Sequence, residues 1–340
     1  MKKNLWLLLL FLVLGGGTAW YLLGKSKQKS TLGWDRMFKV ENPDDIHKIF
    51  LAKRTTGETT TLERQGKDWI YNGKWKARPG AIKNLLEAVT QVQLKYVPPQ
   101  AAIPGIVKDL ATRSIKVEVY NKAGKNLKTY YVGGTTADGR GTYMIMENSD
   151  LPHVMELPLM EGLVLARYDL SGEDWRDRAV FSYQPEEIQA VSMEYPTQRS
   201  KSFRLEKTGD SYSVKPFYEN TQPIERPISK GRVEAFLTGF ERLVAEGFEN
   251  GYEYKDSIRQ LIPFTVITVK DTKGNEKKAA LYSSYIAQSD IGGGRTKDVV
   301  ERYFADVSTG DFMLVQDLVF NKIFWAYEAF FEEPGKQVKD

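Results

Sequence analysis

Two stretches of the chain carry the same local pattern. Residues 61–71 read TLERQGKDWIY and residues 204–214 read RLEKTGDSYSV, so the order Leu-Glu-basic-x-Gly occurs twice at a separation of 143 positions. In each stretch the glycine lies where a turn would join two strands. If the neighbouring segments repeat in step, the chain contains two copies of one architecture, and two copies are too few for a solenoid.

The neighbouring segments do repeat in step. Strand patterns at 46–51 and 188–193 are offset by 142 positions, and hairpin patterns that begin at 114 and 264 are offset by 150. Between these strand patterns, a stripe of apolar residues at helical spacing follows Pro79. A second such stripe, in which each residue is displaced by 151 positions, follows the candidate N-cap Ser229. The stripes are Ile82, Leu85, Leu86, Val89 and Val92, and then Val233, Phe236, Leu237, Phe240 and Leu243. We interpret both as helix faces packed onto a sheet.

The offset grows to 160 towards the C-terminus, first at Tyr143 and Tyr303 and then at the apolar segments 163–164 and 323–324. A duplication that has diverged by loop insertion produces such a drift. We place the extra residues of the second copy in a loop at 287–298, which reads AQSDIGGGRTKD.

This element order predicts an α+β fold, with an N-terminal transmembrane helix followed by two tandem, internally repeated domains of antiparallel sheet and packed helices. The predicted parts are a signal-anchor helix at 1–23, a juxtamembrane tether at 24–33, a first repeat at 34–180 and a second repeat at 181–340. The aromatic and apolar residues near the junction, Trp175, Val180 and Phe181, indicate a packed connection.

The N-terminus contains an apolar run of 19 residues from Leu5 to Leu23. At a helical rise of about 1.5 Å per residue, this run just spans a bilayer core of roughly 30 Å. The alternative is a signal peptide cleaved after Ala19, but the run is longer than a usual signal core and bulky Trp20 would follow the cut. No cysteine is present to carry the lipid of a lipoprotein. We expect a single-pass protein of a bacterial inner membrane with its body in the periplasm.

The charge of the chain does not favour nucleic acid as a partner. The formal net charge is +4, but five lysines precede position 30, and without them 43 basic residues face 44 acidic ones. The basic excess therefore flanks the apolar run, and the body lacks the positive surplus that nucleic-acid binding requires. We expect the membrane, through the N-terminal helix, and other proteins as partners.

No residue pattern predicts catalysis, a metal or a cofactor. The chain has two histidines, His47 and His153, and no cysteine, so a zinc site or a histidine-based triad has little to be built from. A metal cluster of His47 with the neighbouring aspartates is less favoured than an exposed turn, and we expect His153 in a hairpin loop. The carboxylates Glu173, Asp174 and Asp177 alternate with arginines, which predicts mutual neutralisation and no acid-base role.

Two glycine-rich stretches, VGGTTADGRG at 132–141 and DIGGGRTK at 290–297, raise the possibility of phosphate binding. Both lie between predicted strands and lack the Gly-Lys-Ser/Thr sequence and the following helix that would direct backbone N–H groups at a phosphate. We therefore expect turns. The tip that carries Asp138 and Arg140 is a candidate contact for a partner.

Aromatic residues supply the remaining candidate contacts. Trp69 and Trp75 in the first copy and Tyr212 in the second occupy equivalent hairpin regions, where we favour core packing over ligand stacking. Near the C-terminus an aromatic stripe at helical spacing runs over 319–331. It is either the closing helix of the second domain, which we favour, or a docking surface for a membrane partner, with Phe324 and Trp325 as the candidate contact residues.

The chain resembles the bacterial family called domain of unknown function 4340. The residues that carry the resemblance are the apolar start, LERQGKDWIY with the helix at Pro79, YYVGGTTADGRGTYM at 130–144 and DWRDRAVF at 174–181, and the resemblance covers roughly 34–331. It implies a membrane-anchored envelope protein, of a kind often encoded beside ABC-type transporter parts, including gliding-associated ones. The resemblance implies no catalytic residues, because none is assigned in this family.

Our first hypothesis is a non-enzymatic, membrane-anchored envelope protein that acts as an accessory or scaffold subunit of an ABC-type transport complex. The transport link comes from the resemblance alone. The alternative is an extracytoplasmic binding module for a peptide or a cell-wall glycan, which would use the aromatic hairpins or a cleft between the halves. Hydrolase activity is a third and less favoured hypothesis.

Overall fold

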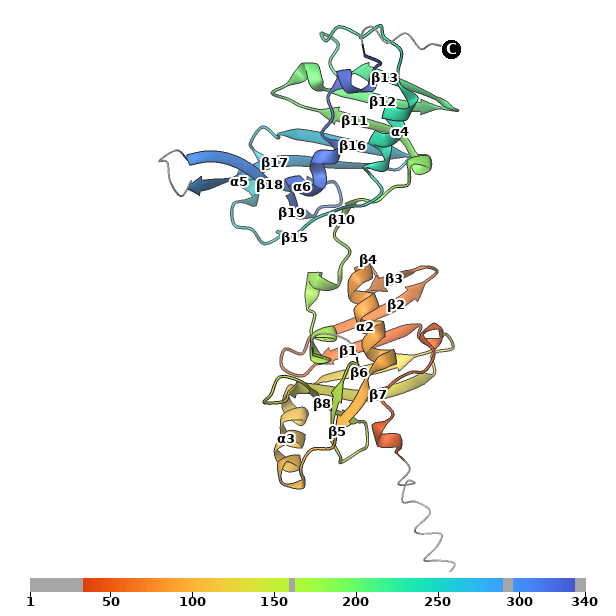
Figure 1. Cartoon of the computed structure of the whole chain (residues 1–340), viewed down its shortest axis with the longest axis vertical. Helices are drawn as coiled ribbons and strands as arrows, with labels where there is room; N and C mark the ends of the chain where they lie inside the picture. Colours follow the sequence, from red (N-terminus) through yellow and green to blue (C-terminus); the bar gives the residue numbers. More distant parts are fainter. Residues whose placement is uncertain (1–32, 159–162, 290–295, 334–340) are drawn as a thin grey trace, which may run out of the picture. The chain divides into compact units, whose positions relative to one another are not determined.

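The structure is a computed structural model that describes residues 33–158, 163–289 and 296–333 (Figure 1). The chain divides between Asp177 and Arg178 into two compact units, unit 1 and unit 2. At the predicted junction, Trp175 belongs to the core of unit 1, whereas Val180 and Phe181 belong to the core of unit 2. The apolar residues that suggested a packed connection are therefore shared between two separate cores.

The predicted transmembrane helix at 1–23 lies outside the described residues, as does the predicted tether at 24–33 except for its last residue. Within the described part of the chain, no helix is long and apolar enough to cross a membrane. Both units are α+β, as the residue pattern predicts, and both are rich in antiparallel sheet.

Unit 1 is built on a nine-stranded sheet with the order β4-β3-β2-β1-β6-β7-β8-β9-β5. Its helices are α2 (Pro79–Gln91) and α3 (Ile103–Arg113), and its first described turns are η1 (Trp34–Arg36) and η2 (Pro43–Asp45). The strands are β1 (Lys48–Lys53), β2 (Thr59–Gln65), β3 (Asp68–Tyr71), β4 (Trp75–Lys76), β5 (Gln93–Tyr96), β6 (Ile115–Tyr120), β7 (Asn126–Thr135), β8 (Thr142–Met146) and β9 (His153–Glu156).

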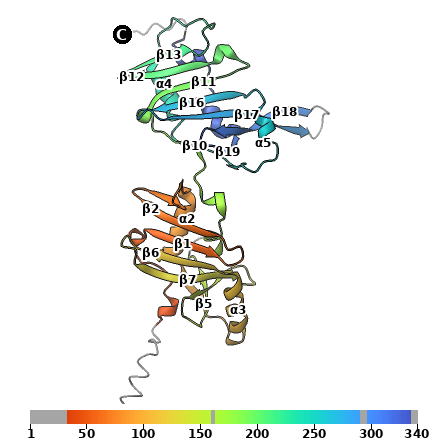
Figure 2. The same ribbon diagram turned by 180° about the vertical axis from the view of Figure 1, so that it is seen from behind.

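The two helices of unit 1 pack on opposite faces of this sheet. Alternate residues of the central strands, such as Ile49 and Val117, form one buried core with Leu85 and Val89 of α2. Figures 1 and 2 show α2 crossing that face of β1 and β2. Helix α3 contacts β7 and β8, where Leu110 meets Gly133. Since the preceding residue of β7 points into the α2 core, Gly133 faces the other side of the sheet.

Unit 2 is built on an eight-stranded sheet with the order β13-β12-β11-β16-β17-β18-β19-β15, and β10 and β14 form a separate pair. Its helices are α4 (Lys230–Thr238), α5 (Lys255–Arg259) and α6 (Asp317–Phe320), followed by the turns η8 (Asn321–Ile323) and η9 (Tyr327–Phe330). The strands are β10 (Ala179–Phe181), β11 (Ile188–Glu194), β12 (Phe203–Thr208), β13 (Ser211–Pro216), β14 (Leu243–Val244), β15 (Gly247–Phe248), β16 (Thr265–Asp271), β17 (Glu276–Ser289), β18 (Thr296–Val307) and β19 (Phe312–Gln316).

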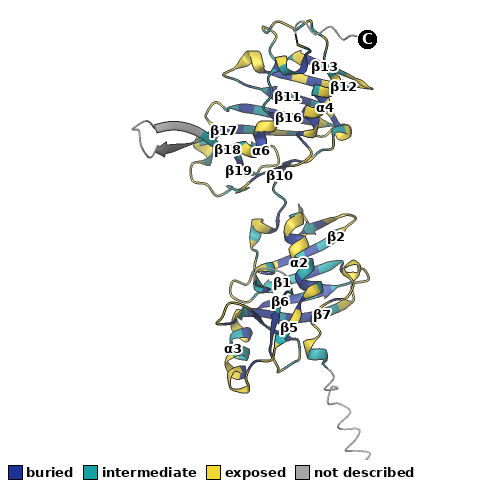
Figure 3. Ribbon diagram, viewed as in Figure 1, coloured by how far each residue is buried: buried dark blue, intermediate teal, exposed yellow. Residues whose placement is uncertain are grey.

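The two strand orders coincide when β3 is matched with β13 and β5 with β15, and only β4 lacks a counterpart. Both sheets bury the residues of one face and the packed side of a helix, which Figure 3 shows as dark bands along the central strands. The strands of the two Leu-Glu stretches are β2 and β12. The first helical stripe falls on α2 except for Val92, which is the C-cap of that helix. The second predicted helix is shorter than its stripe, because α4 ends at Thr238, so that Phe240 lies beyond it and Leu243 begins β14.

Each unit is closed by residues near the end of its described chain. In unit 1 the main-chain N–H of Arg78, just before α2, donates to the carbonyl of Trp175 at 2.8 Å, and Ala77 forms a bridge with Arg176. In unit 2 the N–H of Ser229, just before α4, donates to the carbonyl of Phe330 at 2.9 Å, and Ile228 forms a bridge with Phe331. We call residues 175–177 and 330–332 the closing segments.

Two predicted elements are corrected. The stripe over 319–331 is not one helix, because the chain breaks into α6, η8 and η9 and then extends to bridge Ile228. The segment 287–298 is not a loop throughout, because β17 and β18 continue to Ser289 and from Thr296, and Ala287 pairs with Asp298. The inserted residues thus lengthen a hairpin.

Candidate functional site

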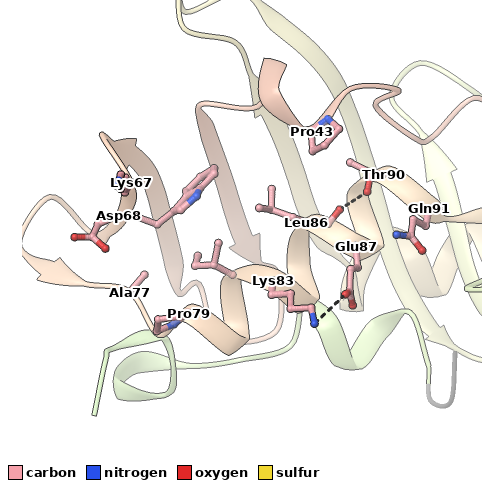
Figure 4. Close-up of a pocket in the computed structure, with 12 residues that line it drawn as sticks. Pro43, Lys67, Asp68, Ala77, Pro79, Lys83, Leu86, Glu87, Thr90 and Gln91 are labelled. Atoms are coloured by element: carbon pink, nitrogen blue, oxygen red, sulfur yellow. Dashed lines mark hydrogen bonds and ion pairs between the residues drawn. The ribbon is translucent and has the colours of Figure 1, made fainter. Parts of the chain in front are cut away.

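A groove lies beside helix α2 on the surface of unit 1, with a volume of about 450 Å³. Three segments line it: η2, the turn and second strand of the β2–β3 hairpin, and the outer side of α2 with Ala77 just before it (Figure 4). The lining residues are Pro43, Lys67, Asp68, Trp69, Ala77, Pro79, Ile82, Lys83, Leu86, Glu87, Thr90 and Gln91.

The position of Leu86 on α2 creates the apolar floor of this groove. The helix begins at Pro79, whose fixed backbone suits a first helical position, and its fully buried face contains Leu85, Ala88 and Val89. Leu86 lies one step around the helix and is half-buried. In Figure 4 it points from the helix into the groove, with Pro43 on the other side. An apolar side chain left at this position offers a contact for a partner.

The rim of the groove is polar and balanced in charge. Lys83 and Glu87 form an ion pair of 3.9 Å along the helix, and the hydroxyl of Thr90 donates to the carbonyl of Leu86 at 2.8 Å. On the hairpin side the rim carries Lys67 and Asp68. Two cations and two anions around an apolar floor suit an apolar peptide segment with polar flanks better than a phosphate or a polyanion.

The two tryptophans of the β3–β4 hairpin are both covered. Trp69 forms part of the groove wall but is 7% exposed. Trp75 has two cations over its ring, because the guanidinium carbon of Arg176 is 3.7 Å from the ring centre and the ammonium of Lys74 is 4.4 Å away. Cation–π contacts of this kind occupy a ring surface that a sugar would need for stacking.

The tip with Asp138 and Arg140 lies at the end of β7, apart from the groove. The main-chain N–H of Arg140 donates to the Asp138 carboxylate at 3.1 Å, and the Thr136 hydroxyl also donates to it. These hydrogen bonds, that of Thr136 first, lower the pKa of Asp138. Both Asp138 and Arg140 are exposed, and the Lys95 ammonium donates to the carbonyl of Arg140 at 2.8 Å.

The remaining aromatic candidates lie in unit 2 and pack on its core. Tyr212 is half-buried on β13. Phe324 meets the rings of Phe264 and Tyr303 at centroid distances of 5.1 and 5.5 Å. Trp325 lies 5.4 Å from Phe330. The structure therefore brings Trp69 and Trp75 together in one hairpin of unit 1, and Phe324 and Trp325 together near the end of unit 2.

The histidines differ from expectation. His153 is not in a loop: it is the first residue of β9, is 1% exposed, and its Nε2 lies 3.8 Å from the Asp35 carboxylate. Burial lowers its pKa. His47 lies half-buried between η2 and β1. Among the described residues, no group of three or more histidine, cysteine, aspartate or glutamate side chains is placed to hold a metal ion.

A family model for a domain of unknown function, DUF4340, matches residues 69–257, which is more than half of the chain. The chain belongs to this family. The resemblance stated from the sequence is thereby confirmed, although the matched range is shorter than the 34–331 over which the resemblance extends. The DUF4340 match begins at Trp69 and contains all of α2, so it includes most of the groove lining. Searches of the curated proteins and of the solved structures found no match.

Sequence reasoning did not single out the groove. It assigned Leu86 to the buried stripe of α2, and it placed the aspartates that follow Pro43 in an exposed turn. The available signal was the width of the stripe: Leu85 and Leu86 are adjacent, so they cannot both face the centre of the core. The second leucine must lie at the edge of the packed face, where a groove can form.

Proposed function

We propose that this protein is a non-catalytic scaffold subunit, anchored in a bacterial inner membrane with its body in the periplasm, that holds a protein partner of an ABC-type transport complex. The groove beside α2 is the contact that we assign to this partner. The observation that supports the assignment most directly is the half-buried Leu86 in an apolar floor, surrounded by a rim of balanced charge. A short apolar segment of a protein fits such a surface.

The membrane anchor and the transport complex enter the proposal from the sequence. The apolar run Leu5–Leu23 has the length of a membrane span. The transport complex comes from the resemblance to DUF4340 proteins, and the family match supports membership without naming a partner. A scaffold role needs only binding surfaces, and the rim pair Lys83–Glu87 is suited to framing a bound segment.

The test is a pull-down of the full-length protein in a gentle detergent, with mass spectrometry of its partners and of its own N-terminus. Leu86→Glu places a charge in the groove floor, and Leu318→Glu, at a leucine that is 81% exposed in unit 2, is the matched control. We expect stoichiometric transport subunits with the wild type and the control, and a loss of about tenfold or more with Leu86→Glu. Circular dichroism and thermal unfolding check that the variant is folded.

If Leu86→Glu recovers transport subunits as well as the wild type does, the groove is not the contact for this partner. A processed N-terminus that starts near Trp20, with no membrane partner recovered, overturns the anchored scaffold as a whole. That result favours the alternative function, an extracytoplasmic binding module for a peptide, because the same groove then serves a soluble ligand.

A glycan ligand is less supported than a peptide, since Trp69 is 7% exposed and Trp75 is covered by Lys74 and Arg176. The glycan hypothesis would be restored if the protein were retained on cell-wall glycan and Trp75→Ala abolished this retention without unfolding the protein. Retention by a peptide column that Leu86→Glu abolishes supports the peptide module.

A further inference from the structure

The segments that carry the exposed apolar side chains of unit 1 lie near one another at one end of the unit. Among its described residues, the large apolar side chains that are more than a third exposed are Met37 at 57%, Tyr96 at 41%, Val97 at 43% and Leu151 at 45%. Single exposed apolar residues are normal on a protein surface, whereas several that meet in one place mark an interaction site.

These four residues lie on three segments that meet around the buried His153. Leu151 precedes it by two positions, and Tyr96 pairs with its neighbour Val154, so that Val97 follows directly at the end of β5. On the third segment, the ring of Phe38, next to Met37, is 6.1 Å from the imidazole. Figures 1 and 2 both show the first turn of the described chain beside β5, at one end of unit 1.

The chain outside the structure indicates what covers this surface. The apolar run ends at Leu23 and η1 begins at Trp34, so the connection has ten residues, three of which are lysines. Such a connection spans at most about 35 Å when fully extended, and about 17 Å on average when relaxed. Met37 follows η1 directly. If Leu5–Leu23 spans the bilayer, this surface is therefore the part of unit 1 held closest to the membrane.

We propose that Met37, Tyr96, Val97 and Leu151, the membrane-proximal patch, rest in the headgroup region of the lipid bilayer. The inference rests on the proposed membrane anchor. Tyrosine with aliphatic neighbours is the composition favoured at the membrane interface. Arg36 is exposed beside Met37 and suits anionic headgroups, whereas the exposed Asp150 beside Leu151 opposes them.

Weak contacts are sufficient for this docking. Four partly exposed side chains would hold a free protein on lipid only loosely. A short tether keeps the patch at a high effective concentration near the surface, so the same contacts then fix unit 1 against the bilayer instead of leaving it to swing.

The absence of cysteine allows a direct test with single labels. Full-length Leu151→Cys and Gln65→Cys proteins are labelled with a fluorophore and reconstituted into vesicles of zwitterionic and anionic phospholipid that contain a headgroup-proximal spin-labelled quencher lipid. Gln65 is exposed on β2, six strands from β5, or about 29 Å at the usual strand spacing. We expect quenching at position 151 to exceed that at position 65 by about twofold or more.

A third label, at Lys25→Cys in the predicted tether, separates the two proposals. If the label at position 25 is quenched but the label at position 151 shows only background quenching, the proposal that the patch rests on lipid is overturned and the proposed anchor is retained. Background quenching at position 25 shows that the anchor itself is wrong. A label at 151 that is shielded from aqueous iodide but silent to the quencher lipid indicates a protein cover, which also overturns lipid docking.

A charge in the patch provides an independent check. In the Leu151→Cys protein, Val97→Asp is expected to return the quenching at position 151 to the level of position 65, because a carboxylate resists transfer from water to the interface. Thermal unfolding verifies that the fold is retained. Unchanged quenching in this folded variant contradicts the proposal.

Discussion

His153 is the residue whose environment departs most from that of a surface histidine. It is buried at the start of β9 against Phe38, and the charged groups that face it are the Asp35 carboxylate and the Arg36 guanidinium. Removal of the imidazole from water disfavours its charged form, and this outweighs the attraction of Asp35, so its pKa lies below 6.5.

This lowered pKa predicts a loss of stability in mild acid. Around and below pH 6.5 the unfolded chain binds a proton that the folded chain does not, so the free energy of unfolding falls as the pH drops from 7.5 towards the folded-state pKa, by at most about 1.4 kcal/mol per pH unit. His153→Phe should remove this dependence, measured by urea unfolding between pH 5.5 and 7.5. Asp35→Asn should deepen it, because the imidazolium then lacks its nearby anion. An identical pH dependence in all three proteins rules the explanation out.

At the scale of elements, the glycine-rich stretch of β7 has a packing explanation. A Cβ atom added at Gly133 would lie 2.5 Å from Cδ2 of Leu110 and 3.2 Å from the carbonyl oxygen of Tyr143, whereas one at Gly134 would meet nothing closer than 3.8 Å. Gly133 therefore allows α3 to approach the sheet, and its neighbour does not have this role.

Gly133→Ala should push α3 away from β7 and cost about 1–3 kcal/mol of stability. Gly134→Ala is the matched control and should be close to neutral. Urea unfolding measures the cost, and hydrogen exchange of residues 103–113 should accelerate in the first variant alone. Combined with Leu110→Ala, the cost of Gly133→Ala should shrink, because the clash partner is gone. Equal effects of the two glycine substitutions count against this role.

The elements that could be predicted from the sequence are those with a clear period. Alternation identified β1, β2 and β6 together with their counterparts, and helical spacing identified α2. Strands β5, β9, β15 and β19 and helices α3 and α5 were not predicted. Several of them have two to five residues, and their pairing is set by partners distant in sequence, such as Val154 for Tyr96. The groove was missed for a related reason, because its floor depends on which side of α2 remains uncovered.

At the scale of the whole molecule, the closing segments explain why the C-terminal stripe is not one helix. Its spacing fits a helix, but the main chain of Phe330 and Glu332 instead hydrogen-bonds to Ser229 and Pro227. The side chains of Phe320, Ile323 and Phe330 still reach the core, since all three are fully buried. The helical pattern therefore predicts correctly which side chains are buried, but main-chain pairing with a distant segment determines the backbone conformation.

Phe330→Ala is expected to destabilise unit 2 by about 3–5 kcal/mol, because it empties a buried site between the rings of Phe203 and Phe236. Each unit has its own core. Hydrogen exchange should therefore lose protection in the sheet of unit 2 while the sheet of unit 1 stays protected. Leu318→Ala, at an exposed side chain, should leave both unchanged. Equal loss of protection in the two sheets argues against independent cores.

The closing segments also set an order for folding during synthesis. The helix α2 gains its main-chain partner only when Trp175 has left the ribosome, and at that moment every residue of unit 1 has been made while most of unit 2 has not. Unit 1 can therefore finish folding while the rest of unit 2 is still being made. Unit 2 cannot complete its fold until Phe330 has been made, because this residue supplies the main-chain partner of Ser229 and a buried ring of the core.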